Sequence, residues 1–431
     1  MKISEMAAGA KEASLKLSAV NAEMKNKALL QIADALKIRK DDIVKANRED
    51  LERSERENLA APLLKRLKFD EAKISDAVDG IKSLIGLEDP VGKTLLSTEL
   101  DDGLELYKVT CPIGVIGIIF ESRPDALVQI STLCLKSGNA VILKGGSEAR
   151  ETNRILTDVI IEATQKAGMP SGWINLLETR SDVNEMLKMD EYIDLIIPRG
   201  SNEFVRYIMD NSKIPVMGHA DGICHCYIDE SANIDMAVKI VTDSKTQYVA
   251  VCNAAETVLI HERIAPECLP VLKKALDEKN VELLGCPESQ KIVRIGAASD
   301  EDWKTEYLDY KLSVKLVRSI DEAIGHINTY GSGHTDSIIT NYKANAVMFM
   351  NMVDSGNVFW NCSTRFSDGF RYGFGAEVGI STSKLHARGP VGLEGLVIYK
   401  YKLIGNGHIV DDYSKHAKVF KHRKLNKDFP Y

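Results

Sequence analysis

The sequence has few cysteines, no long apolar run and no excess of basic charge. Its eight cysteines are scattered over 431 residues, too sparse for a disulfide framework, so we expect reduced thiols. The longest apolar stretch, Ile113–Phe120, falls far short of the roughly 20 residues that a membrane-spanning helix needs. A formal net charge of −7 argues against a general polyanion binder. These shortages exclude a disulfide scaffold, a helical membrane protein and a nucleic-acid-binding protein.

Targeting and nucleotide signatures are also missing. No apolar segment follows Met1–Glu5, so we expect no secretory signal and a cytoplasmic protein. Gly92-Lys93-Thr94 lacks the preceding glycine of a phosphate-binding loop, and we interpret it as a turn. Gly373–Gly379 has one residue too many for the G-x-G-x-x-G dinucleotide motif. The basic tail Lys415–Lys427 is typical of a solvated surface.

Cys224-His225-Cys226 is the one local pattern that resembles a metal site. In an extended segment its two thiols share one face while His225 points away, and no second Cys/His pair stands at zinc spacing. We therefore predict buried thiols here and no metal site.

Short apolar runs alternate with helical segments from Val115 onward. Strands that are apolar on both faces and separated by helices indicate a parallel, doubly wound α/β sheet, whose ligands lie at the carboxyl ends of the strands. The five strands predicted in this block are Val115–Phe120, Ala140–Leu143, Trp173–Leu177, Ile193–Pro198 and Ile214–Met217.

A second alternating block begins after a boundary near Gly218–Gly222 and extends from about Tyr227 to Asn361. It predicts another α/β unit. Its predicted strands are Glu256–His261, Val281–Leu284, Ser337–Thr340 and Asn357–Trp360.

Cys252 differs from the other thiols in its position. It follows a predicted helix and directly precedes a buried strand, where backbone N–H groups can stabilise a thiolate. A nucleophile and an inert core cysteine are both compatible with this position.

Five longer strings carry a family resemblance. They are Val109–Pro124, Val141–Glu148, Gly218–Cys224, Ala250–Thr257 and Phe374–Pro390, the last containing His-Ala-Arg-Gly-Pro. Together they resemble the gamma-glutamyl phosphate reductase (glutamate-5-semialdehyde dehydrogenase) family of the aldehyde dehydrogenase superfamily. The resemblance extends to Tyr401 and does not cover the tail after Tyr413. It implies an aldehyde dehydrogenase-like α/β fold, with two doubly wound parallel-sheet domains and a small oligomerisation β element.

The resemblance also implies a reaction. Cys252 matches the family's nucleophile, which would attack L-glutamate 5-phosphate, release phosphate and form a thioester. Hydride from NADPH would then give L-glutamate 5-semialdehyde, a step of proline biosynthesis. A thiol suits both stages because it is a strong nucleophile and its thioester accepts hydride.

Four residues match the superfamily's cofactor-binding positions. Lys144 would approach the adenosine ribose, Ser201 would begin the helix that faces the pyrophosphate, and Glu306 would bind the nicotinamide ribose. Ser147 stands where NAD-dependent relatives carry a ribose-binding glutamate, which leaves room for a 2′-phosphate and favours NADP. Glu148, one residue further, keeps NAD open.

Two positions depart from ordinary aldehyde dehydrogenases. The oxyanion asparagine falls on Ser122, so the backbone N–H of Cys252 would be a main oxyanion donor. The glutamate that activates hydrolytic water falls on His219, which argues against the closest alternative, a hydrolytic semialdehyde dehydrogenase. A catalytically inactive scaffolding relative is the third possibility, against which Cys252, Lys144 and Glu306 speak.

Basic and polar residues near these strings are candidates for substrate binding. Arg123 would hold the phosphate, or else pair with Glu121. Arg365 or Arg388 would hold the α-carboxylate, or else belong to scaffold ion pairs. The remaining candidates are Asn361, Ser363, Thr364 and His386.

The resemblance gives a domain order and partners. Residues 1–222 would bind NADP, 223–385 would carry the catalytic cysteine, and 386–431 would form a return segment, an oligomerisation strand and the tail. Residues 97–108 would join that strand in a homo-oligomer. A transient complex with glutamate 5-kinase is a further expectation, whereas nucleic acid and membrane are not expected partners.

Overall fold

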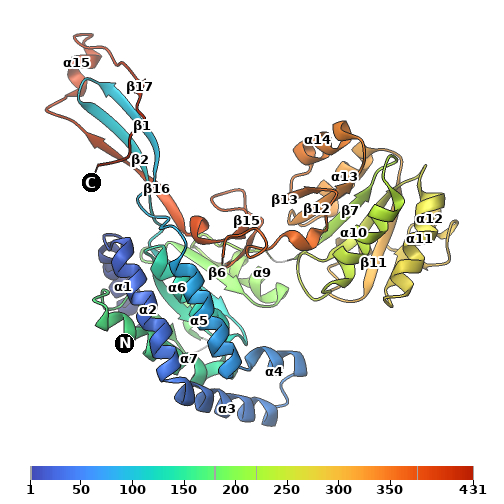
Figure 1. The fold of residues 1–431 in the computed structure, drawn as a ribbon, viewed down its shortest axis with the longest axis horizontal. Coiled ribbons are helices and arrows are strands. Elements are labelled where there is room, and N and C mark those ends of the chain that lie inside the picture. Colours follow the sequence, from blue (N-terminus) through green and yellow to red (C-terminus); the bar gives the residue numbers. More distant parts are fainter. Residues whose placement is uncertain (1, 179–180, 220, 376, 431) are drawn as a thin grey trace.

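The computed structural model describes residues 2–178, 181–219, 221–375 and 377–430. It contains two lobes, each built on its own parallel sheet, and an antiparallel arm (Figure 1). In Figure 1 the first lobe lies at lower left, the second lobe at right and the arm at upper left. The two predicted parallel-sheet units and the small β element are therefore all present.

The first lobe has a four-stranded parallel sheet in the order β5-β4-β3-β6. Its strands are β3 (Val115–Phe120), β4 (Ala140–Lys144), β5 (Ile174–Leu177) and β6 (Leu195–Arg199). Its helices are α1 (Ile3–Leu17), α2 (Ala22–Ile38), α3 (Lys40–Arg56), α4 (Ala61–Leu67), α5 (Glu71–Ile85), α6 (Pro124–Lys136), α7 (Arg150–Lys166), α8 (Ser181–Met186) and α9 (Asn202–Asn211). The strand order reverses beside β3, as doubly wound sheets require.

The predicted fifth strand, Ile214–Met217, is the main correction in this lobe. It forms only an isolated parallel bridge between Ile196 and Val216. Pro215 accepts a hydrogen bond from Ile196 through its carbonyl, but it has no N–H with which to extend a ladder. The apolar pattern was recognised correctly, and the proline limits the pairing.

The second lobe has a parallel sheet in the order β10-β9-β11-β8-β7-β12-β13. Its strands are β7 (Cys224–Ile228), β8 (Ala255–His261), β9 (Glu282–Gly285), β10 (Gly296–Ala297), β11 (Lys311–Val317), β12 (Thr335–Ile339) and β13 (Asn357–Trp360). Its helices are α10 (Ile234–Thr246), α11 (Ala265–Asp277), α12 (Pro287–Gln290), α13 (Ile320–Tyr330) and α14 (Lys343–Met352). The strand order reverses between β7 and β12.

The four strands predicted for this lobe are confirmed, and β7, β10 and β11 are additional. β11 lies inside the sheet between β9 and β8, yet Lys311, Ser313 and Lys315 interrupt its apolar sequence. The Lys315 ammonium lies 3.1 Å from Nδ1 of His326, so a polar contact accounts for one of these interruptions.

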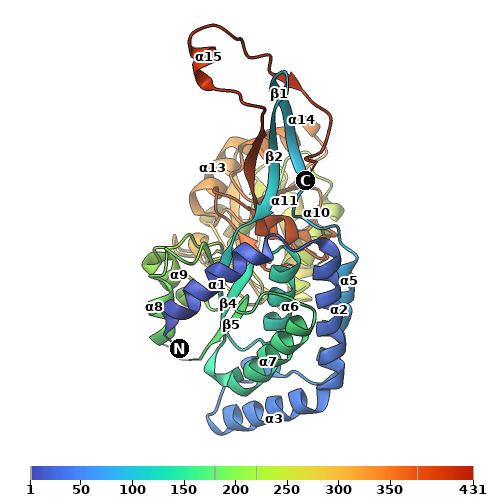
Figure 2. The ribbon, with the colours of Figure 1, turned by 90° about the vertical axis from the view of Figure 1, so that its left-hand side faces the viewer.

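The arm is an antiparallel sheet in the order β16-β2-β1-β17. Its strands are β1 (Thr94–Asp101), β2 (Leu104–Pro112), β16 (Val397–Ile404) and β17 (Arg423–Lys424), and α15 (Val410–Ser414) lies near its tip. Figure 1 shows the arm clear of both lobes, and in Figure 2, turned by 90°, its tip with α15 extends above them. Before entering the arm, the chain forms the pair β14 (Gly379–Ser381) and β15 (Gly389–Val391), and Val378, Val391 and Leu396 pack into the core of the first lobe.

Among the helices of the described residues, none is long and apolar enough to cross a bilayer.

Candidate active site

Cys252 occupies the turn between α10 and β8 and is partly exposed. Two hydrogen bonds tie this turn to the segment after β13. The Thr364 hydroxyl donates to the carbonyl of Asn253 at 2.7 Å, and the Asn253 side-chain amide donates to the carbonyl of Ser367 at 2.7 Å. The turn is therefore held from outside rather than by its own sequence.

The segment joining the two lobes touches the same turn. A Cβ added at Gly222 would overlap the backbone O, Cα and C atoms of Cys252. Only glycine allows two backbones to approach so closely. Gly222 therefore fixes the connection between the lobes directly against the candidate nucleophile.

Two histidines lie beside Cys252. His219, Cys252 and His334 each offer one atom, a ring nitrogen or the sulfur, and these atoms lie within 4.8 Å of one another. The two rings meet edge to face, with centroids 4.8 Å apart. His219 precedes β7, Cys252 precedes β8 and His334 precedes β12, so this cluster lies at the amino ends of the strands.

His219 is placed to act as a base. Its Nδ1 lies 3.0 Å from the carbonyl oxygen of Ile380, which fixes the ring proton on Nδ1 and leaves Nε2 as the acceptor. Burial lowers the pKa of His219 below its usual value, although the Ile380 contact opposes this, so the ring is neutral at neutral pH. The family resemblance implied that His219 replaces the glutamate that activates hydrolytic water in aldehyde dehydrogenases. The structure places the imidazole of His219 near the Cys252 thiol.

Arg365 brings positive charge to this site. Its Nε donates to Oε1 of Gln247 at 2.9 Å, which orients the guanidinium. Burial lowers the pKa of Arg365, and the nearby Arg371 lowers it further, so an anion would stabilise this charge. Arg371 in turn donates to the carbonyl of Arg365 at 2.9 Å. We find no ion pair for Arg365 within the described part of the chain.

Three neighbouring candidates, Asn361, Ser363 and Thr364, are engaged in the scaffold. Both ends of the Asn361 amide bond the backbone of Thr340. The Ser363 hydroxyl accepts from Ser244 at 3.1 Å and from the N–H of Arg365 at 3.2 Å. Together with the bond from Thr364 to Asn253, these contacts make the three residues supports of the site.

The two candidates in the C-terminal string also have structural partners. Arg388 donates to the carbonyl of Asp354 at 3.0 Å and to its carboxylate at 3.2 Å, which is the scaffold ion pair left open by the sequence. The ring of His386 lies 2.8 Å from the carbonyl of Gly395, and its backbone has a φ of 63°. The structure therefore brings Arg365, and not these two residues, to Cys252 through the Gln247 and Thr364 contacts.

Arg123 is largely buried between β3 and α6. Burial lowers its pKa, and the neighbouring Arg199 adds to the effect. The alternative partner, Glu121, instead accepts from the backbone N–H of Ser201 at 3.2 Å, and the ion pairs of the described residues include none for Arg123. A buried guanidinium beside a second one is a place for an anion.

Ser122 bonds to the glutamate that complicated the cofactor prediction. Its backbone N–H and its hydroxyl donate to Oε1 of Glu148 at 2.6 and 2.7 Å, and its φ of 44° is left-handed. In this arrangement Ser122 faces the cofactor-binding side, and the Glu148 carboxylate is occupied by Ser122.

The predicted cofactor residues gather at the carboxyl ends of the first lobe's strands. Lys144 ends β4 and is buried, Ser147 begins a short 3₁₀ helix (Ser147–Ala149), and Ser201 caps α9. A Cβ at Gly200 would come within 2.7 Å of the Glu121 carboxylate, which accepts a hydrogen bond from the N–H of Ser201, so an anionic group occupies the start of α9. A pyrophosphate could take the place of this carboxylate, and with that exchange these residues fit a dinucleotide.

Glu306 lies between the predicted cofactor residues and the residues around Cys252. Its carboxylate accepts from the side-chain amide of Asn202, in the first turn of α9, at 2.5 Å. Burial raises the pKa of Glu306, while Asn202 and the nearby His219 lower it. Glu306 thus lies between the start of α9 and the His219 side of the thiol site, as a residue bound to the nicotinamide ribose should.

Several residues of this site were not predicted from the sequence. His334, Gln247, Arg371 and Arg199 have no local motif, and separate elements bring them in. The only signal was that His334 lies three residues before the predicted strand Ser337–Thr340, which is not specific enough to identify it.

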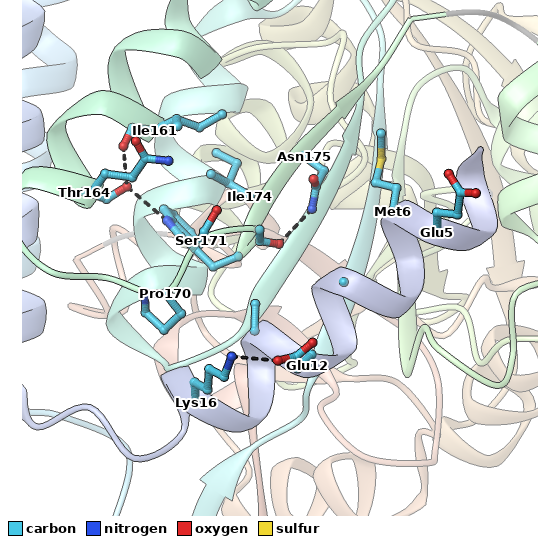
Figure 3. A pocket seen from close by; sticks show the side chains of 15 residues that line it. Glu5, Met6, Glu12, Lys16, Ile161, Thr164, Pro170, Ser171, Ile174 and Asn175 are labelled. Carbon is cyan, nitrogen blue, oxygen red and sulfur yellow. Dashed lines mark hydrogen bonds and ion pairs between the residues drawn. The ribbon is translucent and has the colours of Figure 1, made fainter. Parts of the chain in front are cut away.

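A separate pocket lies away from Cys252 and lacks the thiol and imidazole groups of the candidate active site. It has a volume of about 440 Å³ and lies between α1, the end of α7 and β5 (Figure 3). Glu12 and Lys16 pair with each other across one helical turn, and the side-chain amide of Asn175 donates to Gly172. Its described lining has neither cysteine nor histidine.

Comparisons with known proteins agree with the site. The model of the aldehyde dehydrogenase family matches residues 1–311. A glyceraldehyde-3-phosphate dehydrogenase from Methanocaldococcus jannaschii, complexed with NADP, has the same fold with a TM-score of 0.66 over 93% of this chain and 94% of that one, at 17% identity. The chain belongs to the aldehyde dehydrogenase family, which uses a nicotinamide cofactor.

More similar proteins narrow this assignment. Gamma-glutamyl phosphate reductase from Acetivibrio thermocellus is 77% identical over 430 residues, with both chains fully covered. The crystal structure of gamma-glutamyl phosphate reductase from Thermotoga maritima superposes with a TM-score of 0.92 at 41% identity, over 94% of this chain and 99% of that one. Within the aldehyde dehydrogenases, the chain is a member of the gamma-glutamyl phosphate reductase family and hence an oxidoreductase, as predicted.

Proposed function

We propose that the protein reduces L-glutamate 5-phosphate to L-glutamate 5-semialdehyde and phosphate, using NADPH and a thioester on Cys252. The observation that carries this proposal is the thiol beside two imidazoles, together with the buried guanidinium of Arg365, for which the described residues provide no ion-pair partner. A relative named gamma-glutamyl phosphate reductase, 77% identical to this chain, agrees with this substrate.

The first chemical step begins with the thiol proton. Nε2 of His219 accepts it, because the Ile380 carbonyl holds the other ring proton on Nδ1. The thiolate attacks the acyl carbon, the C–O bond to phosphate breaks, and the phosphate leaves with the electron pair. The backbone N–H of Cys252 stabilises the oxyanion. The predicted part of Ser122 as a second donor requires its hydroxyl to leave Glu148, to which it donates in this structure.

The second step regenerates the thiol. When bound, the reduced dinucleotide supplies the hydride that takes the thioester to the aldehyde level. Lys144, Ser147, Ser201 and Glu306 would hold this cofactor. The engagement of Glu148 with Ser122 supports NADP over NAD, because this carboxylate is then not available to a ribose hydroxyl. As the aldehyde leaves, the thiolate recovers its proton from His219.

Two arginines divide the substrate's charges in this proposal. Arg123, buried beside Arg199 and without an ion-pair partner among the described residues, suits the phosphate. Arg365, held by Gln247, suits the α-carboxylate.

The test is the reverse reaction, followed as NADP reduction with glutamate semialdehyde in the presence and absence of phosphate. Strict dependence on phosphate is expected, because phosphate is the acyl acceptor. Equal rates without phosphate would identify the hydrolytic alternative, in which His219 activates water.

We propose that the arm joins copies of this chain into a homo-oligomer. β16 is an edge strand of eight residues, and its outward residues are unusually apolar for a free surface. The exposed fractions of Tyr399, Tyr401 and Leu403 are 50%, 60% and 57%. Burial of these side chains against a second copy would remove this apolar surface from water.

A transient complex with glutamate 5-kinase, in the cytoplasm, is the remaining proposal. Its basis is chemical, since an acyl phosphate is labile and direct transfer would protect it. Titration of purified kinase against the reductase should raise the coupled rate beyond that of the two enzymes acting independently, and an unchanged rate would contradict the complex.

A further inference from the structure

We propose that His219, Cys252 and His334 form a binding site for a soft divalent cation of the Zn²⁺ type, and that the bound cation blocks the enzyme. The donor set is two imidazole nitrogens and one sulfur, and both ligand types suit Zn²⁺. The Cys-His-Cys segment singled out in the sequence is not this site, because Cys224 and Cys226 are buried in β7 and His225 bonds Asp336.

The geometry is close to that of a three-ligand zinc site. The three donor atoms lie within 4.8 Å of one another. Zinc bonds of about 2.3 Å to sulfur and about 2.0 Å to nitrogen need donors roughly 3.3 to 3.8 Å apart, so a shift of about 1 Å is required. The Cys252 sulfur can supply this shift by rotation of its partly exposed side chain while the backbone stays held, whereas His334 is fully buried.

An unsatisfied atom gives independent evidence for a ligand. Nε2 of His334 is buried and has no hydrogen-bond partner in the described structure, while Nδ1 lies 2.7 Å from the Thr335 hydroxyl. A buried polar atom without a partner costs free energy, which a bound cation would recover. With three protein ligands, the fourth position of a tetrahedral site stays open to water.

Binding and catalysis exclude each other. The cation displaces the thiol proton to solvent, and the sulfur lone pair that would attack the acyl carbon forms the sulfur–metal bond instead. The proposal concerns binding at the same residues as the proposed reaction but does not depend on its substrate. A binding measurement made without turnover can therefore contradict the proposed cation site while leaving the proposed reaction untouched, and the reverse holds for an activity assay.

The experiment titrates the metal-free full-length protein with Co²⁺ as a spectroscopic probe and then with Zn²⁺. We expect a thiolate–Co²⁺ charge-transfer band at one equivalent, displaced by Zn²⁺ and absent in Cys252→Ala. His334→Asn and His219→Asn keep an amide near the Nδ1 position but lose Nε2, and each should weaken Co²⁺ binding roughly tenfold or more. His408→Asn, on the arm, is the matched control and should bind as the parent does.

Kinetic measurements test whether cation binding inhibits the enzyme. Zn²⁺ should slow both turnover and alkylation of Cys252 over the concentration range that displaces Co²⁺, and a chelator should restore both. The proposal is overturned by a band that persists in Cys252→Ala, by a missing band, or by unchanged affinity in a folded His334→Asn protein. If circular dichroism shows that His334→Asn does not fold, unchanged affinity in His219→Asn overturns it.

Discussion

Cys252 owes its role to what surrounds it. Seven other cysteines are present, and most are buried in apolar packing; burial raises the pKa of Cys134 and Cys226 to about 12, which keeps both thiols protonated. Cys252 is instead partly exposed, lies in a turn held by Thr364, and faces two imidazoles.

Replacing Cys252 with Ala should reduce turnover by at least about 10³-fold, because no other group can form the acyl intermediate. Dinucleotide affinity, measured by fluorescence titration, should stay within about twofold. Cys111→Ser removes another partly exposed thiol, on the arm, and should keep full activity. An active Cys252→Ala enzyme would remove the proposed nucleophile.

Arg365 and Arg388 are distinguishable by their effects on KM. Arg365→Gln should raise the substrate KM on the order of tenfold or more, since a charge-assisted bond to a carboxylate contributes about 1.5–3 kcal/mol. Arg388→Gln should act mainly on thermal stability, because Arg388 pairs with Asp354. Steady-state kinetics and melting curves of both variants test this, and a larger KM effect from Arg388 would reverse the assignment.

Single residues could be nominated from the sequence where a local string carried the information, as it did for Cys252 and Lys144. Arg365 was chosen instead because it follows the predicted strand Asn357–Trp360, and the roles of all three stay predictions. His334 and Gln247 could not be found in this way, because only the pairing of β12 with β7 and the end of α10 bring them to the thiol. Asn361 and Ser363 were selected by proximity in sequence, yet their polar atoms bond the scaffold.

Among the elements, the connection between the lobes is the most constrained. Gly222→Ala would push a methyl group into the Cys252 backbone, so we expect a loss of stability of about 1–3 kcal/mol and a lower turnover number. Gly325→Ala is the control, since a Cβ there meets open space in α13 and should stabilise the helix by about 0.5–1 kcal/mol. Urea unfolding and initial rates of both variants test this prediction. Normal stability and activity in Gly222→Ala would contradict the close approach of the Gly222 and Cys252 backbones.

The contact between β11 and α13 predicts a pH effect. Burial lowers the pKa of His326 to about 2, with His225 and Lys315 adding to the shift. The folded protein therefore resists protonation that the unfolded chain accepts, and this group's contribution to stability is lost as pH falls below the unfolded value of about 6.5. Between pH 6.5 and 5.5 the loss from this residue should be about 1 kcal/mol.

His326→Leu is the variant that checks this. Its free energy of unfolding, measured by urea titration, should fall less steeply with acidification than that of the parent, by about 1 kcal/mol over the same interval. The exposed-surface control is His416→Leu, whose slope should match the parent. Identical slopes in His326→Leu and the parent would show that His326 does titrate in the folded state.

Elements with plain periodicity were predictable and interrupted ones were not. β13 has the predicted bounds, because apolar spacing and flanking residues agree. Ile214–Met217 fails as a strand at Pro215, and β11 was missed because its lysines and serine break the apolar run. The expectation of ligands at carboxyl ends holds for Lys144 and Ser201, but the thiol lies at the amino ends of the second sheet.

The arrangement of lobes and arm came from the family resemblance. Periodicity indicated two α/β blocks, yet nothing local indicates that β2 near residue 110 pairs with β16 near residue 400. Such pairing depends on a return across nearly 300 residues, which only the folded chain or a related structure reveals.

The arm carries the prediction for assembly. Tyr399→Asp/Tyr401→Asp should lower the solution mass measured by analytical ultracentrifugation to that of a single chain, because charge on the apolar face of β16 opposes its burial. Lys400→Asp/Lys402→Asp, on the same strand, tests whether charge alone has this effect and should leave the assembly intact. A parent that already sediments as a single chain would contradict the proposed oligomer.

The contact between Gly222 and Cys252 makes the nucleophile a sensor of movement. A rotation of one lobe against the other that moves Gly222 must also displace the Cys252 backbone, because the two backbones are in close contact. The rate at which a small alkylating reagent labels Cys252 therefore reports the motion of the lobes as well as thiol chemistry. Ligands that bind only the first lobe, far from Cys252, should change that labelling rate without contacting the sulfur.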